Sequence, residues 1–132
     1  MKGYTDLEQS KKLAEILPLE SADMYYHYDN DFDELESIPT ITEEDDHFVL
    51  FPKDVRCWSL AALLSVLPFH LFDNNQRYAF SMHKGLNKDG ETYMIRYNIF
   101  NTDVCLYETD YYNSPIDACY EMTLKLHELN LL

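Results

Sequence analysis

The side chains of this chain with the greatest capacity to bind or react are carboxylates, and many of them lie in one segment. From Glu20 to Phe51 there is no Lys or Arg, and eleven acidic residues there carry most of a formal net charge of −14. They are Glu20, Asp23, Asp29, Asp31, Asp33, Glu34, Glu36, Glu43, Glu44, Asp45 and Asp46. Such uncompensated charge repels itself and attracts cations or a basic partner. The pattern therefore predicts binding and is not a catalytic signature.

Part of this segment has the spacing that opens a calcium-binding loop. Asp29, Asp31 and Asp33 alternate as the first ligands of such a loop do. The sixth position would be Glu34 where glycine is needed, and the twelfth would be Thr40 where a bidentate Glu is needed. The five histidines show neither paired spacing nor zinc-like spacing with cysteine. We therefore expect a solvated acidic loop, with no metal site and no cofactor.

The sequence patterns that could supply a nucleophile or a phosphate-binding loop are weaker than the acidic pattern. Cys57 lies near a predicted helix start beside Arg56, an arrangement that can stabilise a thiolate. The apolar run that follows indicates a cysteine packed as a small hydrophobic residue. Gly3, Gly85 and Gly90 are too far apart for a phosphate-binding loop.

Eleven tyrosines are the second unusual feature. Six of them fall in or beside acidic segments: Tyr25, Tyr26, Tyr28, Tyr107, Tyr111 and Tyr112. Tyrosine suits interfaces because it buries a large area and keeps a hydrogen-bonding tip. Aromatic residues are also favoured in a half-exposed sheet, so both interpretations stay open.

The elements that position these residues follow from periodicity and capping patterns. Residues 5–8 have the pattern of a capping box, and an apolar stripe then predicts a helix over residues 6–17 that Pro18 ends. A short strand is predicted at residues 24–28. The stretch at residues 29–46 has few apolar anchors and predicts a mobile acidic loop or hairpin.

A compact strand is predicted at residues 47–51, where Pro52 ends it. Asp54 is placed to cap a helix through residues 57–67. This helix is apolar nearly all round, so we expect it to be central, with Trp58 and Leu63 in the core.

The C-terminal half predicts an antiparallel meander followed by a helix. Strands are expected at residues 78–86, 92–100 and 104–112, joined first by a turn at residues 87–90. Ser114 then caps the last helix, whose buried stripe is Ile116, Cys119, Met122, Leu126 and Leu129. The prediction is a single α+β domain of residues 1–132 with a three- to four-stranded antiparallel sheet and N-terminal, central and C-terminal helices.

Composition limits the class of protein and its partners. The 46% hydrophobic content is ample for a core, and no apolar run is long enough to span a bilayer. Three widely spaced cysteines indicate thiols in a reducing compartment, so we expect a cytoplasmic protein. A pI near 4.5 argues against direct binding to nucleic acid or to an anionic membrane.

Three segments resemble known sequences: residues 13–24, residues 57–68 and residues 112–118. They include Leu-Ala-Glu-Ile-Leu-Pro, Cys-Trp-Ser-Leu-Ala-Ala-Leu-Leu and Tyr-Asn-Ser-Pro-Ile-Asp-Ala. The chain resembles small uncharacterised proteins encoded by phages and integrated mobile elements of gut bacteria. The resemblance implies a mobile-element accessory protein and no assigned activity.

The leading expectation is a non-enzymatic acidic protein that engages a basic protein surface, with mimicry of nucleic acid as one form of it. Its binding residues are expected to be Asp29, Asp31, Asp33, Glu34, Glu36, Glu43, Glu44, Asp45, Asp46, Tyr25 and Tyr26. One alternative is a structural or assembly homo-oligomer that uses an aromatic face of the sheet. The other is an enzyme with a carboxylate pair, for which Glu108 and Asp110 are the best candidates.

Overall fold

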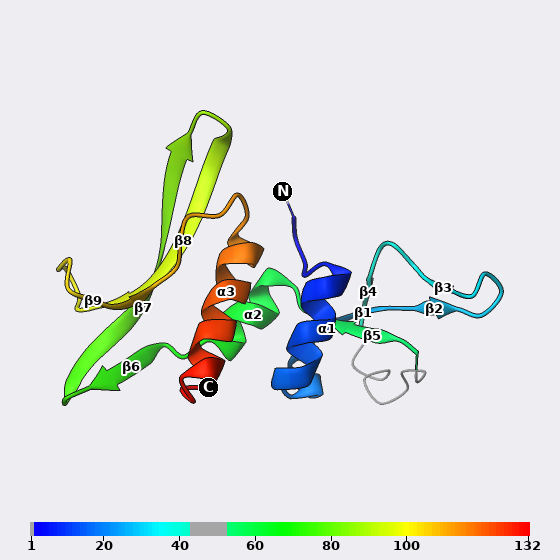
Figure 1. Cartoon of the computed structure of the whole chain (residues 1–132), viewed down its shortest axis with the longest axis horizontal. Coiled ribbons are helices and arrows are strands. Elements are labelled where there is room, and N and C mark those ends of the chain that lie inside the picture. The colour runs from blue at the N-terminus through cyan, green and yellow to red at the C-terminus, as the bar shows by residue number, and fades with distance from the viewer. Residues whose placement is uncertain (1, 43–52) are drawn as a thin grey trace. The chain divides into compact units, whose positions relative to one another are not determined.

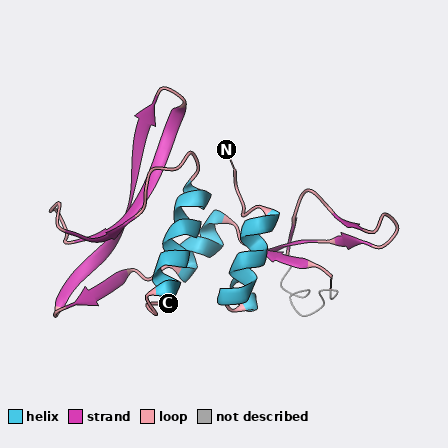
Figure 2. Cartoon of the chain, viewed as in Figure 1, coloured by secondary structure: helices cyan, strands magenta, loops and turns pink. Residues whose placement is uncertain are grey.

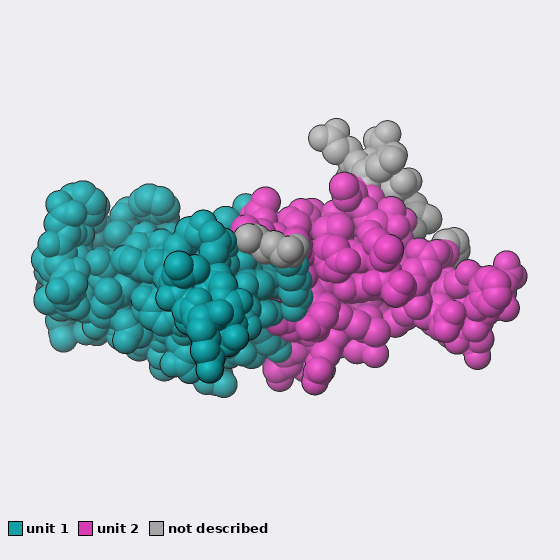
Figure 3. All heavy atoms as spheres, turned by 90° about the horizontal axis from the view of Figure 1, so that it is seen from above, with its two compact units in different colours: residues 1–2, 63–132 teal, residues 3–62 magenta. Residues whose placement is uncertain are grey.

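The computed structural model describes residues 2–42 and 53–132 and shows an α+β fold (Figure 1). The described part has three α-helices, a four-stranded antiparallel meander and two smaller sheets (Figure 2). Contacts divide the chain into two compact units, one of residues 3–62 and one of residues 1–2 and 63–132 (Figure 3). We call them the N-terminal unit and the C-terminal unit.

The N-terminal unit contains one complete α-helix, one 3-10 helix and five short strands among its described residues. They are α1 (Leu7–Ile16), the 3-10 helix η1 (Leu19–Ser21), β1 (Met24–Tyr26), β2 (Tyr28–Asp29), β3 (Glu34–Leu35), β4 (Thr40–Ile41) and β5 (Val55–Cys57). β1 lies between β4 and β5 in a three-stranded antiparallel sheet, and β2 pairs with β3 in a hairpin. The predicted strand at residues 47–51 lies outside the described residues.

The predicted first helix is present, but its cap is shifted by one residue. Asp6 is the N-cap, and its carboxylate accepts a hydrogen bond from the Gln9 backbone at 2.8 Å while the Gln9 side chain accepts from the Asp6 backbone. The prediction of a Thr5 cap is wrong, because the buried Thr5 hydroxyl makes its hydrogen bonds with other residues of the N-terminal unit. It accepts a hydrogen bond from the Trp58 backbone at 3.1 Å.

The central helix is shorter than predicted. Residues 55–57 form strand β5 instead of a first helical turn, and α2 runs over Leu60–Val66. Asp54 does not cap a helix, because its carboxylate accepts a hydrogen bond from the Tyr28 backbone at 2.8 Å. The Ser59 hydroxyl instead accepts from Ala62 three residues later, which is the contact of an N-cap.

The predicted core positions of this region are confirmed. Trp58 and Leu63 are both fully buried. The Trp58 indole donates a hydrogen bond to the Ser21 hydroxyl at 2.9 Å, which satisfies its one polar group.

The C-terminal unit is built on the predicted meander with one strand added. β6 (His70–Asp73), β7 (Gln76–Asn87), β8 (Gly90–Asn98) and β9 (Cys105–Glu108) are neighbours in chain order, all antiparallel. β6 is not among the strands expected from the sequence. Asn74 and Asn75 join it to β7 with φ of 50° and 65°, the backbone of a two-residue type I′ turn.

Helix α3 (Pro115–Glu128) packs against β8. Ser114 caps it as predicted, accepting a hydrogen bond from the Asp117 backbone. The predicted stripe of Ile116, Cys119, Met122 and Leu126 is fully buried. Leu129 is 42% exposed, since it lies beyond the last helical turn, so its assignment to that stripe is wrong.

Candidate functional site

The acidic segment contains an ordered hairpin made by β2 and β3. Its register places Tyr28 opposite Leu35 and Asp29 opposite Glu34. The Asp31 backbone donates a hydrogen bond to the Asp29 carboxylate at 2.9 Å, and the Tyr28 hydroxyl donates to the Asp33 carboxylate. Aspartate side chains thus form the turn themselves, as they commonly do in tight turns. We call residues 29–36 the acidic hairpin.

The acidic hairpin holds like charges next to each other. Carboxylates directly opposite on paired strands have Cβ atoms about 5 Å apart and destabilise the pair, and this is the relation of Asp29 to Glu34. Asp31, Asp33 and Glu36 add three more exposed acidic groups. Within residues 2–42 and 53–132 none of these five carboxylates forms an ion pair. The described cation Lys53 contacts the hairpin, since its ammonium lies 4.5 Å from the centre of the Tyr28 ring, but it leaves most of this negative charge unpaired.

Apolar side chains stand out beside these charges. Phe32 lies in the hairpin loop and its side chain is 74% exposed. Ile38 and Ile41 follow in and near β4 and are about equally exposed. Exposed apolar groups surrounded by charge have the composition of an interface anchor within a polar rim.

The two tyrosines expected at this surface have different environments. Tyr26 is 4% exposed, and its hydroxyl donates a hydrogen bond to the Thr5 carbonyl at 2.8 Å. Burial raises the pKa of Tyr26 well above its usual range. Tyr26 is therefore a core residue, whereas Tyr25 is half-buried and lies opposite Arg56 and Thr40 in the sheet. The other expected binding residues, Glu43, Glu44, Asp45 and Asp46, lie outside the described residues.

The calcium-like spacing does not gather ligands. Asp29 accepts from the backbone of Asp31, and Asp33 is engaged by a tyrosine hydroxyl. Asp33 also takes a positive φ of 53°, as the hairpin turn requires. Over the described ranges, no group of three or more His, Cys, Asp or Glu side chains is arranged to hold a metal ion.

The thiols are mostly core groups. Cys57 and Cys119 are fully buried, and burial raises the pKa of both, that of Cys119 to about 12. The interpretation of Cys57 as a buried small residue is confirmed, since a desolvated thiol is a poor nucleophile. Cys105 differs because it is only half-buried.

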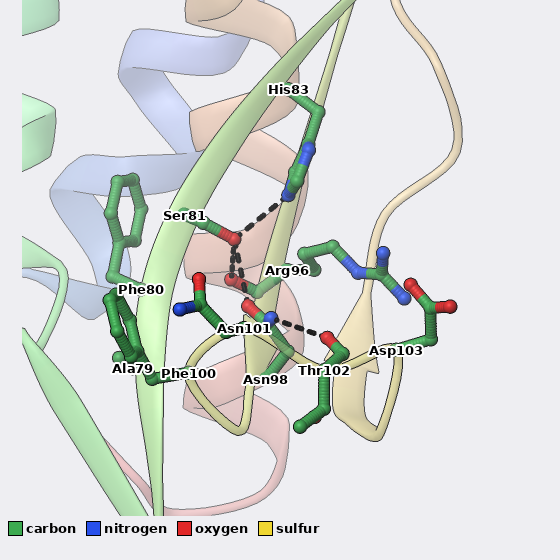
Figure 4. Close-up of a pocket in the computed structure, with 10 residues that line it drawn as sticks. All are labelled: Ala79, Phe80, Ser81, His83, Arg96, Asn98, Phe100, Asn101, Thr102 and Asp103. Atoms are coloured by element: carbon green, nitrogen blue, oxygen red, sulfur yellow. Dashed lines mark hydrogen bonds between the residues drawn. The ribbon is translucent and has the colours of Figure 1, made fainter.

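A polar hollow of about 490 Å³ lies on the sheet of the C-terminal unit (Figure 4). Ser81 and His83 from β7 and Arg96 and Asn98 from β8 line it, together with the loop that precedes β9. Ser81 Oγ lies 3.0 Å from His83 Nε2, the separation of a serine nucleophile and its base. Sequence reasoning missed this pair, although the alternation of a strand places residues two apart on the same face.

The hydrogen bonds around Ser81 oppose a nucleophilic role. The Asn98 amide nitrogen donates to the carbonyls of Ile99 and Thr102, which turns its oxygen toward Ser81 at 2.9 Å. The single hydroxyl hydrogen of Ser81 has two oxygen acceptors, the Asn98 side chain and the Arg96 carbonyl at 3.4 Å, and when it is donated to either of them His83 Nε2 is the donor to Ser81 Oγ. A histidine with that nitrogen protonated cannot accept the serine proton.

Arg96 supplies the positive charge of this hollow. Its guanidinium lies 3.5 Å from the Glu108 carboxylate, and its Nε is buried without a hydrogen-bond partner in the described structure. Asp103 faces it from the loop (Figure 4). Two carboxylates beside one guanidinium leave the hollow without the excess positive charge that an anion site needs.

A second hollow of about 400 Å³ contains the carboxylates considered for an enzyme. Glu108, Asp110 and Glu121 line it with Lys125. Burial raises the pKa of Glu121, and the negative charges of Asp117 and Asp110 raise it further. Glu108 and Asp110 are both solvent-exposed, so this hollow lacks the enclosed environment in which carboxylates are tuned for catalysis.

No protein-family model, curated protein or solved structure matches this chain. No helix in the described part of the chain has the length and apolar character needed to cross a membrane.

Proposed function

We propose that this protein is a small acidic binding protein whose acidic hairpin engages a basic surface on a partner protein. One observation carries the proposal: Asp29 and Glu34 are held directly opposite each other, and neither has an ion-pair partner among the described residues. Such a pair costs stability in the free protein. A basic partner placed over it removes that repulsion, so part of the binding energy comes from relief of strain already present.

The turn hydrogen bonds support recognition by shape as well as by charge. Asp29 and Asp33 are tied to the hairpin by contacts from Asp31 and Tyr28. While the hairpin is closed, carboxylates held in this way resemble a nucleic-acid backbone more closely than a flexible acidic tail does, since phosphates have fixed spacing. A nucleic-acid-binding protein is therefore the partner class we propose. The resemblance to phage and mobile-element proteins makes a host protein the natural source.

Phe32 adds an apolar contact to this surface. Charge pairs exposed at the rim of an interface contribute little each, while a central aromatic side chain often contributes most. An aromatic ring 74% exposed between Asp31 and Asp33 suits that central position. The partner we propose therefore has an apolar groove bordered by Lys or Arg.

The test compares two variants with equal loss of charge. One carries Asp31→Asn, Glu34→Gln and Glu36→Gln in the acidic hairpin. Its matched control carries Glu15→Gln, Asp89→Asn and Glu128→Gln at exposed positions elsewhere. Each immobilised protein is incubated with lysate of its native cell, and the captured basic proteins are eluted with increasing salt and identified.

We expect the hairpin variant to lose a specific basic partner and the control to retain it. Capture should weaken with salt, because the Debye length is only about 10 Å at 0.1 M. Added duplex DNA should release the same partner, since both occupy its basic surface. Equal loss of capture by both variants would mean that net charge alone is responsible, and the proposal would fail.

A further inference from the structure

The C-terminal unit contains a third hollow, whose walls are mainly aromatic, and we call it the aromatic hollow. The hollow, of about 410 Å³, lies where β6 and β7 meet the end of β8, and Phe69, Phe80 and Phe100 form its aromatic walls. Its polar lining comes from His70, Gln76 and Arg77. Ligand pockets in proteins commonly have about this volume and a mainly apolar lining.

The walls of this hollow are unusually open to solvent. Phe69 is 74% exposed and Phe100 is 79% exposed, and neighbouring Phe72 on β6 is 69% exposed. Among the described strands, β6 lies at the edge of the sheet and is hydrogen-bonded only to β7. Exposed aromatic side chains gathered around a hollow mark an interaction surface.

The charge of the aromatic hollow is opposite to that of the whole chain. The chain has 24 acidic residues, yet none of the described residues that line this hollow is a carboxylate. Arg77 is exposed, and in the described structure its guanidinium has no ion-pair partner. The other two hollows described above both contain carboxylates. The aromatic hollow is thus suited to bind an aromatic group that has negatively charged groups next to it.

The acidic hairpin of the same chain has this chemistry. Phe32 is 74% exposed and lies between Asp31 and Asp33. Neither aspartate has an ion-pair partner among the described residues. We propose that the aromatic hollow binds the acidic hairpin of a second copy of this chain. Phe32 enters between Phe69 and Phe100, and the flanking aspartates meet Arg77.

This association is head-to-tail, because the two contacting surfaces are different. Each copy that donates its hairpin keeps a free hollow, and each copy that receives one keeps a free hairpin, so chains can extend or close into a ring. The net charge of −14 on each copy opposes association at low salt. At 0.15 M salt the Debye length is about 8 Å, so most of that repulsion is screened while contacts inside the hollow remain.

The experiment measures mass by sedimentation over a concentration series at 0.15 M salt. The wild type should show a mass that increases with concentration. Phe32→Ala removes the inserted side chain, and Phe100→Ala removes one wall of the hollow. Each variant alone should be monomeric, while Leu86→Ala, at an equally exposed position on β7, should behave as wild type.

Mixing the two monomeric variants gives the decisive result. The Phe32→Ala copy still has an intact hollow and the Phe100→Ala copy still has an intact hairpin, so the mixture should form a 1:1 dimer that cannot extend. A wild type that stays monomeric, or a mixture that does not dimerise, would overturn the inference. So would self-association lost in Phe100→Ala but kept in Phe32→Ala, which would mean a symmetric contact through β6.

The inference goes beyond the proposed function and can fail separately from it. Phe100 lies outside the acidic hairpin, so Phe100→Ala should abolish self-association while capture of a basic partner is retained or increased, because the hairpin is no longer occupied by a second copy.

Discussion

Thr5 shows how one hydroxyl side chain organises the N-terminal unit. It is fully buried; its hydroxyl lies 2.7 Å from the Ser10 hydroxyl and accepts from the Trp58 backbone, and its carbonyl accepts from Tyr26. These contacts join the start of α1 to β1 and to the residue that follows β5. Buried polar groups that are fully paired in this way fix one arrangement of the surrounding elements.

Thr5→Val should therefore destabilise the protein although it preserves shape. The Trp58 backbone N–H and the Ser10 hydroxyl would lose a buried partner, which costs about 1–3 kcal/mol. Thr5→Ser keeps the hydroxyl and loses one buried methyl, at a cost of about 1 kcal/mol. Urea unfolding gives both values. A Thr5→Val protein as stable as Thr5→Ser would show that the hydroxyl is not the important group.

Glu121 predicts a pH dependence of stability. Its pKa is raised in the folded protein by burial and by Asp117 and Asp110, so the folded state binds its proton more tightly than the unfolded state does. The stabilisation is complete below the unfolded pKa, near 4.5, and is lost as pH rises through the folded pKa. Glu121→Gln removes this loss.

The free energy of unfolding of Glu121→Gln, relative to wild type, should then be higher at pH 8 than at pH 5. Denaturant titrations of both proteins at the two pH values measure it. A difference that is the same at both pH values would contradict the raised pKa.

Residues whose role is local could be predicted from sequence, and residues with remote partners could not. Ser114 was assigned correctly because its capping contact reaches only Asp117, three residues away. Asp54 was assigned wrongly because its carboxylate contacts the Tyr28 backbone 26 residues earlier in the chain. Tyr26 looked like a surface residue beside acidic neighbours, and its contact with Thr5 could not be read from spacing.

Among the elements, those with strong periodicity were predicted and the shortest were not. The period-two pattern predicted a strand at residues 92–100, and β8 spans Gly90–Asn98. Tyr93, Ile95 and Tyr97 share a buried face, but Thr92 and Met94 on the opposite face are buried as well. β6 has four residues, too few for a clear pattern. The asparagines of its turn were the available signal, since two adjacent residues with positive φ favour Asn and Gly.

The acidic hairpin is an element of low local stability. β2 and β3 have two residues each, and neither contains a buried residue. Their like-charge pair weakens them further. Segments with few buried contacts open most readily.

Amide hydrogen exchange at residues 29–36 should thus be much faster than in β8, where five of nine residues are buried. Binding a basic partner should slow it. Protection equal to that of β8 in the free protein would contradict the assignment of strain to this hairpin.

At the scale of the whole molecule, the two proposed surfaces differ in charge. The acidic hairpin carries carboxylates without ion pairs around Phe32, whereas the described lining of the aromatic hollow contains Arg77 and no carboxylate. A basic partner and a second copy of the chain would compete for the same hairpin. Self-association would then cover the acidic hairpin until a basic partner displaces the second copy.

The measurement that tests the central claim most directly is a titration of isotope-labelled full-length protein with a lysine- and arginine-rich peptide, followed by backbone NMR. The account predicts that the largest shift changes fall at residues 29–36, that Phe32 is among them, and that they decline with added salt. Changes centred on Glu108, Asp110 and Glu121, or spread evenly over all exposed carboxylates, would contradict the claim that the acidic hairpin is the binding surface.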